Sequence, residues 1–384
     1  MGFLVTPSGE ITSGLKDLRN RAMRALAKMR TTLGAFFMHD ISNTIHLYTY
    51  VIRPILLYCC DFWGCLKLPK NNPIETFHTR FCKQLLGVRK QTNNDAALQE
   101  LGLLPISIHA TKIAMRNWER IQDEKANRLL VTSHHNAFEE NLPWTSNVRN
   151  IFALNGLLET YTNKVDGSVD DSGRETMSDI LFTRMVDQYN QKSFGTINTS
   201  NKLCVYRQLK TEPGRETYLS EVQFSKHRKA MTKLRTSSHS LEIERGRWND
   251  DSDREDRLCH FCKVNGVNKV EDEAHFLIDC PQYKELRDKL LPPRILNNPG
   301  LNSEQKLVKI LSDKNSLKST AKFIYQAFED RKIGLDVLNT IEDLVQSTEK
   351  IHTANSLSSS TKHGSYTIKS SSDDGMKITL AKIL

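Results

Sequence analysis

Residues 258–283 read LCHFCKVNGVNKVEDEAHFLIDCPQY and contain three of the chain's eight cysteines. Cys259, Cys262, His275 and Cys280 follow the spacing C-x2-C-x12-H-x4-C. Thiolates and a neutral imidazole at this spacing are the usual ligands of closed tetrahedral zinc sites. Because four protein ligands leave no open coordination position, the pattern predicts a structural zinc ion (Zn2+) rather than a catalytic one.

The residues between the two ligand pairs favour this interpretation. Residues 265–268 are mostly turn formers, which can return the second pair to the first. The acidic residues 271–273 suit the first turn of a helix that carries His275. On a continuous α-helix, positions five apart point about 140° away from each other, so His275 and Cys280 would not share a metal. Pro281 removes this conflict, because it disfavours the helical conformation at Cys280.

Two alternatives to this ligand set stay open. His260 lies between the first two cysteines and is the most plausible competing ligand. The other alternative is a chance cluster of buried cysteines around a core histidine, since a free cysteine often behaves as a small hydrophobe. Four ligands at finger-like spacing favour the metal site over the chance cluster.

The composition limits the class of protein. The chain has 384 residues, of which 38% are hydrophobic, so it can bury two or three modest cores and several domains are expected. The first residues lack the basic flank and apolar run of a signal peptide. Residues 51–66 contain Arg53 and Asp61 and are too short to cross a hydrocarbon core of about 30 Å, so a buried helix is expected. Cysteines in such apolar patterns indicate a reducing compartment, so we expect an intracellular protein, nuclear or cytoplasmic, that is neither secreted nor bound to a membrane.

Basic residues are concentrated near the N-terminus. Residues 1–90 carry thirteen Lys and Arg against five Asp and Glu, which accounts for +8 of the total net charge of +9. Residues 13–34 repeat apolar side chains at helical spacing, and these basic residues fall largely outside that stripe: Lys16, Arg19, Arg24, Lys28 and Arg30. A second cluster precedes the cysteines and consists of Arg228, Lys229 and Lys233. Each cluster is either an ordinary solvated helix face or a surface that contacts nucleic-acid phosphates.

Helix signals continue through the first third of the chain. Ser42 is expected to cap a helix that is kinked near Pro54. Pro73 begins an apolar repeat that Gly87 ends, and Gly102 ends the next one. Four or five helices with short loops predict a bundle, so we expect a mainly α fold.

Two parts of the sequence resemble the reverse transcriptases of non-LTR retrotransposons, the long interspersed elements of animal genomes. KLRTSSHSLEIERGRW (233–248), followed by RLCHFCKVNGVNKVEDEAHFLIDCPQYKELR (257–287), is similar to their C-terminal zinc-binding region. GFLVTPSGEITSGLKDLRNRAMRALAKM (2–29) is similar to the segment just after the palm subdomain. YVIRPILLYCCDFWG (50–64) and residues 77–106 resemble the thumb and the helices after it.

The resemblance covers roughly residues 2–335 and implies a division of the chain. A thumb-like basic helical domain is expected over residues 1–123, a helical connector with a flexible insertion over 124–200, and a small zinc-binding module over 201–335. Residues 336–384 are expected to be partly helical and then a disordered Ser/Lys-rich tail, because they contain too little apolar surface to fold.

The resemblance also implies what the chain lacks. Polymerase chemistry needs two metal ions held by carboxylates, and the family carries an adjacent aspartate pair for this in its palm. The chain is expected to begin after that point. Its Asp-Asp pairs at 170–171, 250–251 and 373–374 lie among Ser, Asn or Gly residues and are interpreted as turns. No catalytic residue is therefore predicted.

These observations lead to one expectation about function and two alternatives. We expect a truncated, non-catalytic fragment of a retrotransposon reverse transcriptase that binds RNA, DNA or both through the eight basic residues of the two clusters. The alternatives are a zinc-stabilised protein-interaction module and a non-functional element remnant. Residues 259–290 carry five basic and six acidic side chains, so their charge does not decide between binding nucleic acid and binding protein.

Overall fold

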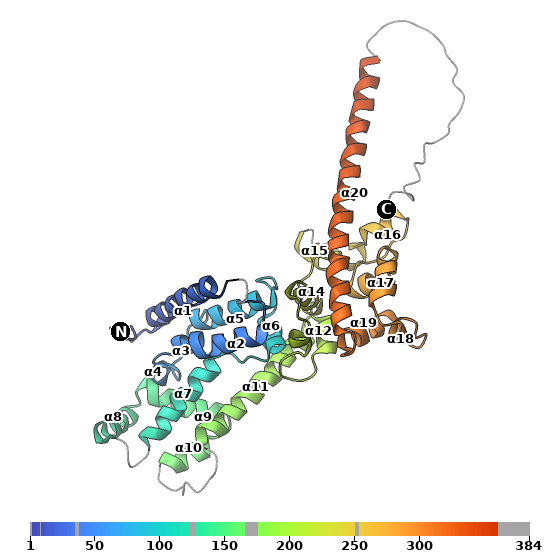
Figure 1. Ribbon diagram of the computed structural model, residues 1–384. Helices are drawn as coiled ribbons and strands as arrows, with labels where there is room; N and C mark the ends of the chain where they lie inside the picture. The colour runs from blue at the N-terminus through green and yellow to red at the C-terminus, as the bar shows by residue number, and fades with distance from the viewer. Residues whose placement is uncertain are drawn as a thin grey trace. The chain divides into compact units, whose positions relative to one another are not determined.

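The structure is a computed structural model that describes residues 2–7, 9–34, 38–122, 127–165, 176–249 and 253–359 (Figure 1). The chain divides into two compact units, Met1–Glu329 and Asp330–Leu384. The described residues form helices and two isolated antiparallel bridges but no strand, so the predicted mainly α fold is confirmed. Residues 166–175 of the predicted insertion (166–176), the three Asp-Asp pairs and the tail from residue 360 lie outside the described residues.

The first part of the larger unit is a bundle around two stacked aromatic rings. The ring of Tyr48 stacks on the ring of Phe81, with 4.2 Å between the ring centroids. Trp63, which follows Tyr48 in the sequence, is also fully buried. The predicted apolar stripe of the first helix is buried at Leu15 and Leu18. The helices in chain order are α1 (Thr12–Leu33), α2 (Ile41–Leu47), the π-helix η2 (Tyr48–Ile52), α3 (Arg53–Leu56), α4 (Cys60–Trp63), α5 (Pro73–Leu86), α6 (Asn94–Leu101) and α7 (Ile106–Ile121).

Most of the predicted helix boundaries agree with the structure. Pro73 begins α5, Gly87 follows it with a φ of 72°, and Gly102 follows α6 with a φ of 64°. The prediction that Ser42 caps a helix was wrong, because the Asp40 side chain accepts a hydrogen bond from the Asn43 backbone at 3.1 Å. The segment expected as one buried helix is divided into η2, α3 and α4. Its division is consistent with the missing N–H of the proline that it contains.

A second core lies between the bundle and the helices that follow it in sequence. Trp118 of α7 packs against Phe152 at 5.1 Å and against Tyr161 at 5.2 Å. Besides α7, the contributing helices are α9 (Pro143–Leu154), α10 (Leu158–Val165) and α11 (Met177–Thr199). The helix α8 (Arg128–Glu139) has no buried residue. Figure 1 shows α11 running from α10 toward α12. The predicted connector is therefore helical in its described part. The finer division at residues 123, 200 and 335 stays a prediction.

The cysteine-rich sequence belongs to a third core. Phe276 packs between Tyr283, at 5.0 Å, and Phe328, at 4.7 Å. The elements here are α12 (Cys204–Leu209), α13 (Tyr218–Glu221), α14 (Ser225–Arg235), α15 (Glu242–Asn249), η3 (Arg254–Asp256), α16 (His260–Val264), η4 (His275–Asp279), η5 (Pro281–Tyr283), α17 (Lys284–Leu290), α18 (Pro293–Leu296), α19 (Ser303–Ser312) and the start of α20 (Leu317–Ser359).

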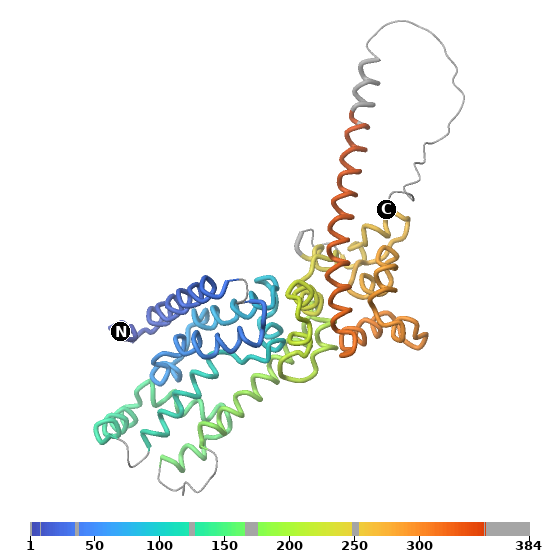
Figure 2. Tube along the Cα trace, viewed as in Figure 1, coloured from blue at the N-terminus to red at the C-terminus, as the bar shows by residue number. Residues whose placement is uncertain are grey.

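A buried ionic network joins α6 of the bundle to α14. Arg235 is 2% exposed, and its guanidinium donates to the carboxylates of Glu100, at 2.8 Å, and Glu216. The Tyr218 hydroxyl donates to the same Glu100 oxygen at 2.6 Å, and Lys210 lies 2.8 Å from Glu216. Figure 2 shows α14 lying between the N-terminal helices and the cysteine-rich residues. The network thus anchors the helix that leads into the candidate metal site.

The smaller unit is described over residues 330–359, which continue α20. Leu344 and Val345 of this helix are exposed. Within the part of the chain that the structure describes, no helix combines the length and the apolar character that a membrane span requires.

Candidate functional site

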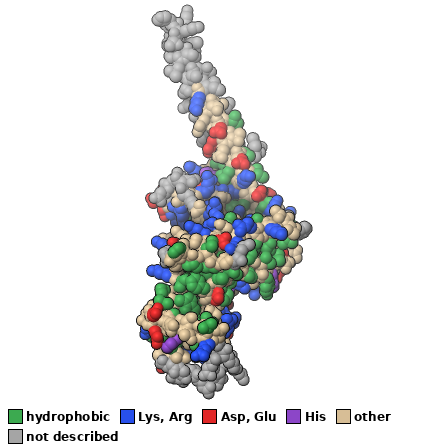
Figure 3. Space-filling model, turned by 90° about the vertical axis from the view of Figure 1, so that its left-hand side faces the viewer, with side chains coloured by type: hydrophobic (Ala, Val, Ile, Leu, Met, Phe, Trp, Pro, Cys, Tyr) green, Lys and Arg blue, Asp and Glu red, His purple; other side chains and the backbone are tan. Residues whose placement is uncertain are grey.

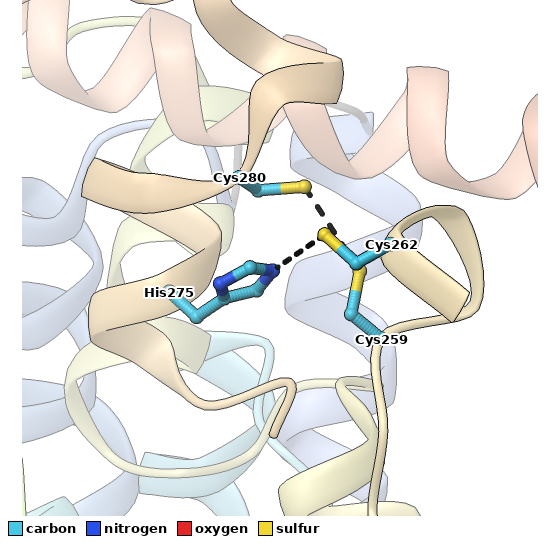
Figure 4. A group of neighbouring side chains, drawn as sticks. All are labelled: Cys259, Cys262, His275 and Cys280. Atoms are coloured by element: carbon cyan, nitrogen blue, oxygen red, sulfur yellow. Dashed lines mark hydrogen bonds between the residues drawn. The ribbon is translucent and has the colours of Figure 1, made fainter. Parts of the chain in front are cut away.

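The four predicted ligands lie together and can hold a metal ion. Their ligand atoms all lie within 4.8 Å of one another, and all four side chains are buried. The Sγ atoms of Cys259 and Cys280 are 3.9 Å apart, and the Cys262 Sγ lies 3.4 Å from Nε2 of His275 (Figure 4). The competing ligand His260 is not part of the group, because its side chain is 45% exposed and its Nε2 lies 3.3 Å from Glu242.

A short turn positions the first two ligands. The backbone N–H groups of Asn265 and Val267 both donate to the Cys262 carbonyl, at 3.1 and 2.9 Å. Gly266 has a φ of 74°, a left-handed conformation that favours glycine. An antiparallel bridge between Leu258 and Val270 then closes the turn. The predicted return of the chain between the ligand pairs is confirmed.

A π-helical turn positions the other two ligands. The Cys280 N–H donates to the carbonyl of His275, five residues earlier, at 2.8 Å. This wider turn brings the fifth residue back to the side of the first, which an α-helix does not do. Cys280 itself has extended dihedral angles, φ −60° and ψ 122°, as expected for a residue before a proline. The effect attributed to Pro281 is thus present, but the segment is a π-helix rather than the predicted α-helix.

The acidic residues before His275 lie at the start of this helical segment, as predicted, and they also anchor it through hydrogen bonds that the prediction did not include. Glu271 is 1% exposed and accepts a hydrogen bond from the Glu242 backbone at 2.8 Å. Glu273 accepts from the buried His239 at 3.0 Å. Only Asp272 caps the segment, since its side chain accepts from the His275 N–H at 2.8 Å.

Arg287 is a supporting residue that the sequence analysis missed. Its buried guanidinium donates to the carbonyl oxygens of Leu277, at 2.9 Å, and Cys280, at 2.6 Å. Burial lowers the pKa of Arg287. His239 lies in the stretch 233–248 and Arg287 in the stretch 257–287, both of which carry the family resemblance. Their spacing to the metal ligands shows no periodicity, so the sequence did not indicate the hydrogen bonds that these two residues make.

The thiols influence one another's ionisation. The hydrogen bond from Cys280 lowers the pKa of Cys259 to about 4 and raises that of Cys280. Burial raises the pKa of Cys262 to about 11. Without a bound cation, the group therefore favours a state in which one cysteine is ionised over a state in which all three are. A divalent ion reverses this preference, because thiols bind metals in the deprotonated form.

The first basic cluster lies on the outward side of α1, and we call it the α1 basic face (Lys16, Arg19, Arg24, Lys28 and Arg30). Four of the five side chains are exposed, and Arg19 is half-buried. Lys16, Arg24 and Lys28 form no ion pair with any residue that the structure describes. Their charges are thus not neutralised by a described carboxylate.

The second basic cluster is only partly on the surface. Lys233 is exposed and Lys229 is half-buried. Arg228 is 4% exposed, and its guanidinium donates to the carbonyl oxygens of Val222, at 2.8 Å, and His39. We therefore correct the assignment of Arg228 as a nucleic-acid contact, because its donors are occupied by the backbone inside the protein.

The two clusters lie at the same end of α5. Arg30 donates to the Gln84 side chain of α5 at 2.8 Å. Lys229 packs over Gly87, where an added Cβ would lie 2.7 Å from the lysine side chain. The Arg89 N–H donates to the Ser238 hydroxyl at 2.9 Å. We call the resulting set the α5 basic surface: Arg30, Lys83, Arg89, Lys90, Lys229 and Lys233.

Neighbouring positive charges act on one lysine of this surface. Burial lowers the pKa of Lys229, and the neighbouring cations Arg228 and Lys233 lower it further. On the side of the molecule that Figure 3 displays, Lys and Arg side chains are most frequent across the middle of the view. No protein-family model matches the chain, and neither a curated protein nor a solved structure was found to match it.

Proposed function

We propose that the chain binds RNA or DNA through the α5 basic surface and the α1 basic face, without catalysing a reaction on it. The observation that carries this proposal is the meeting of two basic clusters, about 200 residues apart in sequence, at one end of α5. Concentrated positive charge binds nucleic acid by neutralising phosphates and releasing their counterions. The resemblance to non-LTR reverse transcriptases supports the same function.

We further propose that the cysteine and histidine group binds one structural zinc ion. Two sulfurs that each lie about 2.3 Å from a tetrahedral zinc ion are separated by about 3.8 Å. The separation between Cys259 and Cys280, 3.9 Å, fits this value. With all four ligands supplied by the protein, the ion would stabilise the turn and the π-helix around it. Elemental analysis of purified protein is expected to give one zinc per chain, and zinc content unchanged by Cys262→Ser would contradict the ligand set.

Nucleic-acid binding is tested by the salt dependence of affinity. Lys90 and Lys233 are exposed and come from the two sides of the α5 basic surface. If each contacts one phosphate, replacing both by Gln reduces the slope of log affinity against log salt by about 1.4 for single strands and about 1.8 for duplex DNA. Filter binding at several salt concentrations measures this slope. An unchanged slope would contradict the proposed surface.

Two further variants locate the contact and control for total charge. Arg19, Arg24 and Lys28 changed together to Gln test the α1 basic face, and weaker binding to RNA and DNA alike is expected. Lys284→Gln with Lys289→Gln removes the same charge as the Lys90 and Lys233 variant, from exposed positions on α17. If the α1 variant binds like the parent and the Lys90 and Lys233 variant does not, the contact lies on the α5 basic surface alone.

The proposed absence of catalysis has its own test. Purified protein is expected to extend no primer on an RNA or DNA template, whatever divalent metal is supplied, because the resemblance does not include the palm's aspartate pair. Template-dependent nucleotide incorporation by protein free of contaminating polymerase would refute it.

A further inference from the structure

A cavity of about 530 Å³ lies on the zinc region, and its role as a binding site rests on the proposed zinc ion but not on nucleic-acid binding. Its apolar lining comes from Val267, Val270, Ala274 and Pro281, and the ligands Cys262 and His275 also line it. The first residues of α19 close one side. The volume is within the range of roughly 300–1,000 Å³ that is usual for ligand pockets.

The charged residues around this cavity are mainly acidic. Asp272, Asp279 and Glu304 line it, against a single basic residue, Lys269. Asp279 accepts a hydrogen bond from Ser303 at 2.8 Å. Neither Asp279 nor Glu304, both of which are exposed, forms an ion pair with a residue that the structure describes. Two carboxylates at the opening are thus available to an incoming cation.

The metal ligands that line the cavity add to this negative charge. Three thiolates and a neutral imidazole around a divalent ion carry a net charge of −1. Phosphates would therefore be repelled from the cavity, in contrast to the α5 basic surface. The charge of the cavity fits a basic ligand and disfavours nucleic acid.

Val267 supplies the apolar part of the recognition. It is 46% exposed at the tip of the turn between the ligand pairs, where the neighbouring residues are Gly266 and Asn268. Its position contributes little to the buried core of the zinc region, so an apolar side chain there has no evident structural role. A ligand that covers Val267 would remove apolar surface from water.

We propose that this cavity binds a peptide segment of a partner protein, in which an aliphatic or aromatic side chain stands beside a lysine or arginine. The apolar side chain enters between Val267 and Pro281. The neighbouring cation pairs with Asp279 and Glu304 at the opening. This binding site is separate from the α5 basic surface, and it does not depend on nucleic-acid binding.

The test uses the zinc-loaded full chain and a phage-displayed library of random heptapeptides. Selection is expected to enrich peptides with an aliphatic or aromatic residue within a few positions of Lys or Arg. The enriched peptides are then synthesised with a fluorescent label, and their affinity is measured by fluorescence polarisation. Absence of such enrichment, or enrichment of acidic peptides, would overturn the proposal.

Two variants test the site itself. Asp279→Asn with Glu304→Gln is expected to weaken the enriched peptide by about fivefold, because exposed ion pairs are individually weak. Val267→Ser is expected to weaken it by about fivefold as well, through lost apolar contact. All three positions are partly or fully open to solvent, so zinc content and thermal stability should match the parent.

A matched control removes two acidic residues elsewhere. Glu212→Gln with Glu285→Gln neutralises exposed carboxylates that do not line the cavity, and peptide affinity should be unchanged. Equal weakening in this control would show a general charge effect and overturn the site. If Val267→Ser instead lowers RNA affinity, and RNA displaces the peptide, the cavity belongs to a nucleic-acid surface and the proposal is wrong.

Discussion

Replacing Arg235 by Met is expected to destabilise the larger unit strongly. Arg235 is the central cation of the network between α6 and α14, and its side chain is 2% exposed. The change leaves the fully buried carboxylate of Glu100 without its cation. One oxygen of that carboxylate, Oε2, already has no hydrogen-bond partner among the described residues. The remaining support is the Tyr218 hydroxyl, which donates at 2.6 Å.

The size of the effect follows from this burial. Removing one partner of a buried ion pair costs about 3–5 kcal/mol, because the other charge stays buried and uncompensated. Adding Glu100→Gln removes that charge while keeping an oxygen acceptor for Tyr218. The double variant should therefore recover part of the loss, leaving a deficit of about 1–3 kcal/mol from the remaining hydrogen bonds.

Urea unfolding followed by circular dichroism measures these free energies by linear extrapolation. Arg294→Met is the control: it breaks an ion pair with Asp313 in which the arginine is 62% exposed, so that water can replace it, and should cost no more than about 1 kcal/mol. The reasoning would be refuted if Arg235→Met stayed within about 1 kcal/mol of the parent. A double variant no more stable than Arg235→Met would refute the role of the buried Glu100 charge.

Three further predictions concern the metal region and acid stability. Arg287→Lys should weaken metal affinity by about 10- to 100-fold, measured by competition with a chelator, because a lysine cannot hold both the Leu277 and Cys280 carbonyls in the same geometry. Removing the metal should increase amide hydrogen exchange around Cys259 and Cys280 while the amides around the Tyr48 core stay protected; equal exchange in both would contradict this. Burial lowers the pKa of His78 to about 4 in the folded protein. Between pH 6.5 and 4 the unfolded chain therefore binds a proton at His78 that the folded chain does not, so the free energy of unfolding should fall as the pH drops from about 6.5 to 4. His78→Gln should reduce this pH dependence. The urea midpoint measured at several pH values would contradict this if it changed with pH as steeply in the variant as in the parent.

Sequence reasoning predicted local features better than distant contacts. The four metal ligands could be identified because their residue types and spacing are specific, and Gly87 and Gly102 marked helix ends that require left-handed backbone. Arg228 was assigned to the surface because its neighbours in sequence are basic. Its burial depends on the His39 carbonyl, 189 positions away, which no local pattern reports.

The hydrogen bonds of the acidic residues before His275 could not be predicted, for a similar reason. A helix dipole explains acidic residues at a helix start from local sequence alone. Glu271 and Glu273 also accept hydrogen bonds from residue 242 and from His239, on a segment about 30 positions earlier. The resemblance to non-LTR reverse transcriptases, the nucleic-acid contacts and the domain boundaries stay predictions.

The π-turn between His275 and Cys280 indicates how the same metal site could form in a related chain that has one residue fewer between these two ligands. In an α-helix the fourth residue after His275 would point about 40° from it, close enough to share a metal. The π-turn accommodates one additional residue, so the fifth residue, Cys280, takes that place. Deletion of one residue such as Ile278 would shorten the spacing to H-x3-C, and an ordinary α-turn could then close the same site. H-x3-C and H-x4-C, which a search for sequence patterns treats as different, would therefore form the same kind of metal site. They would differ only in whether the turn between the two ligands is an α-turn or a π-turn.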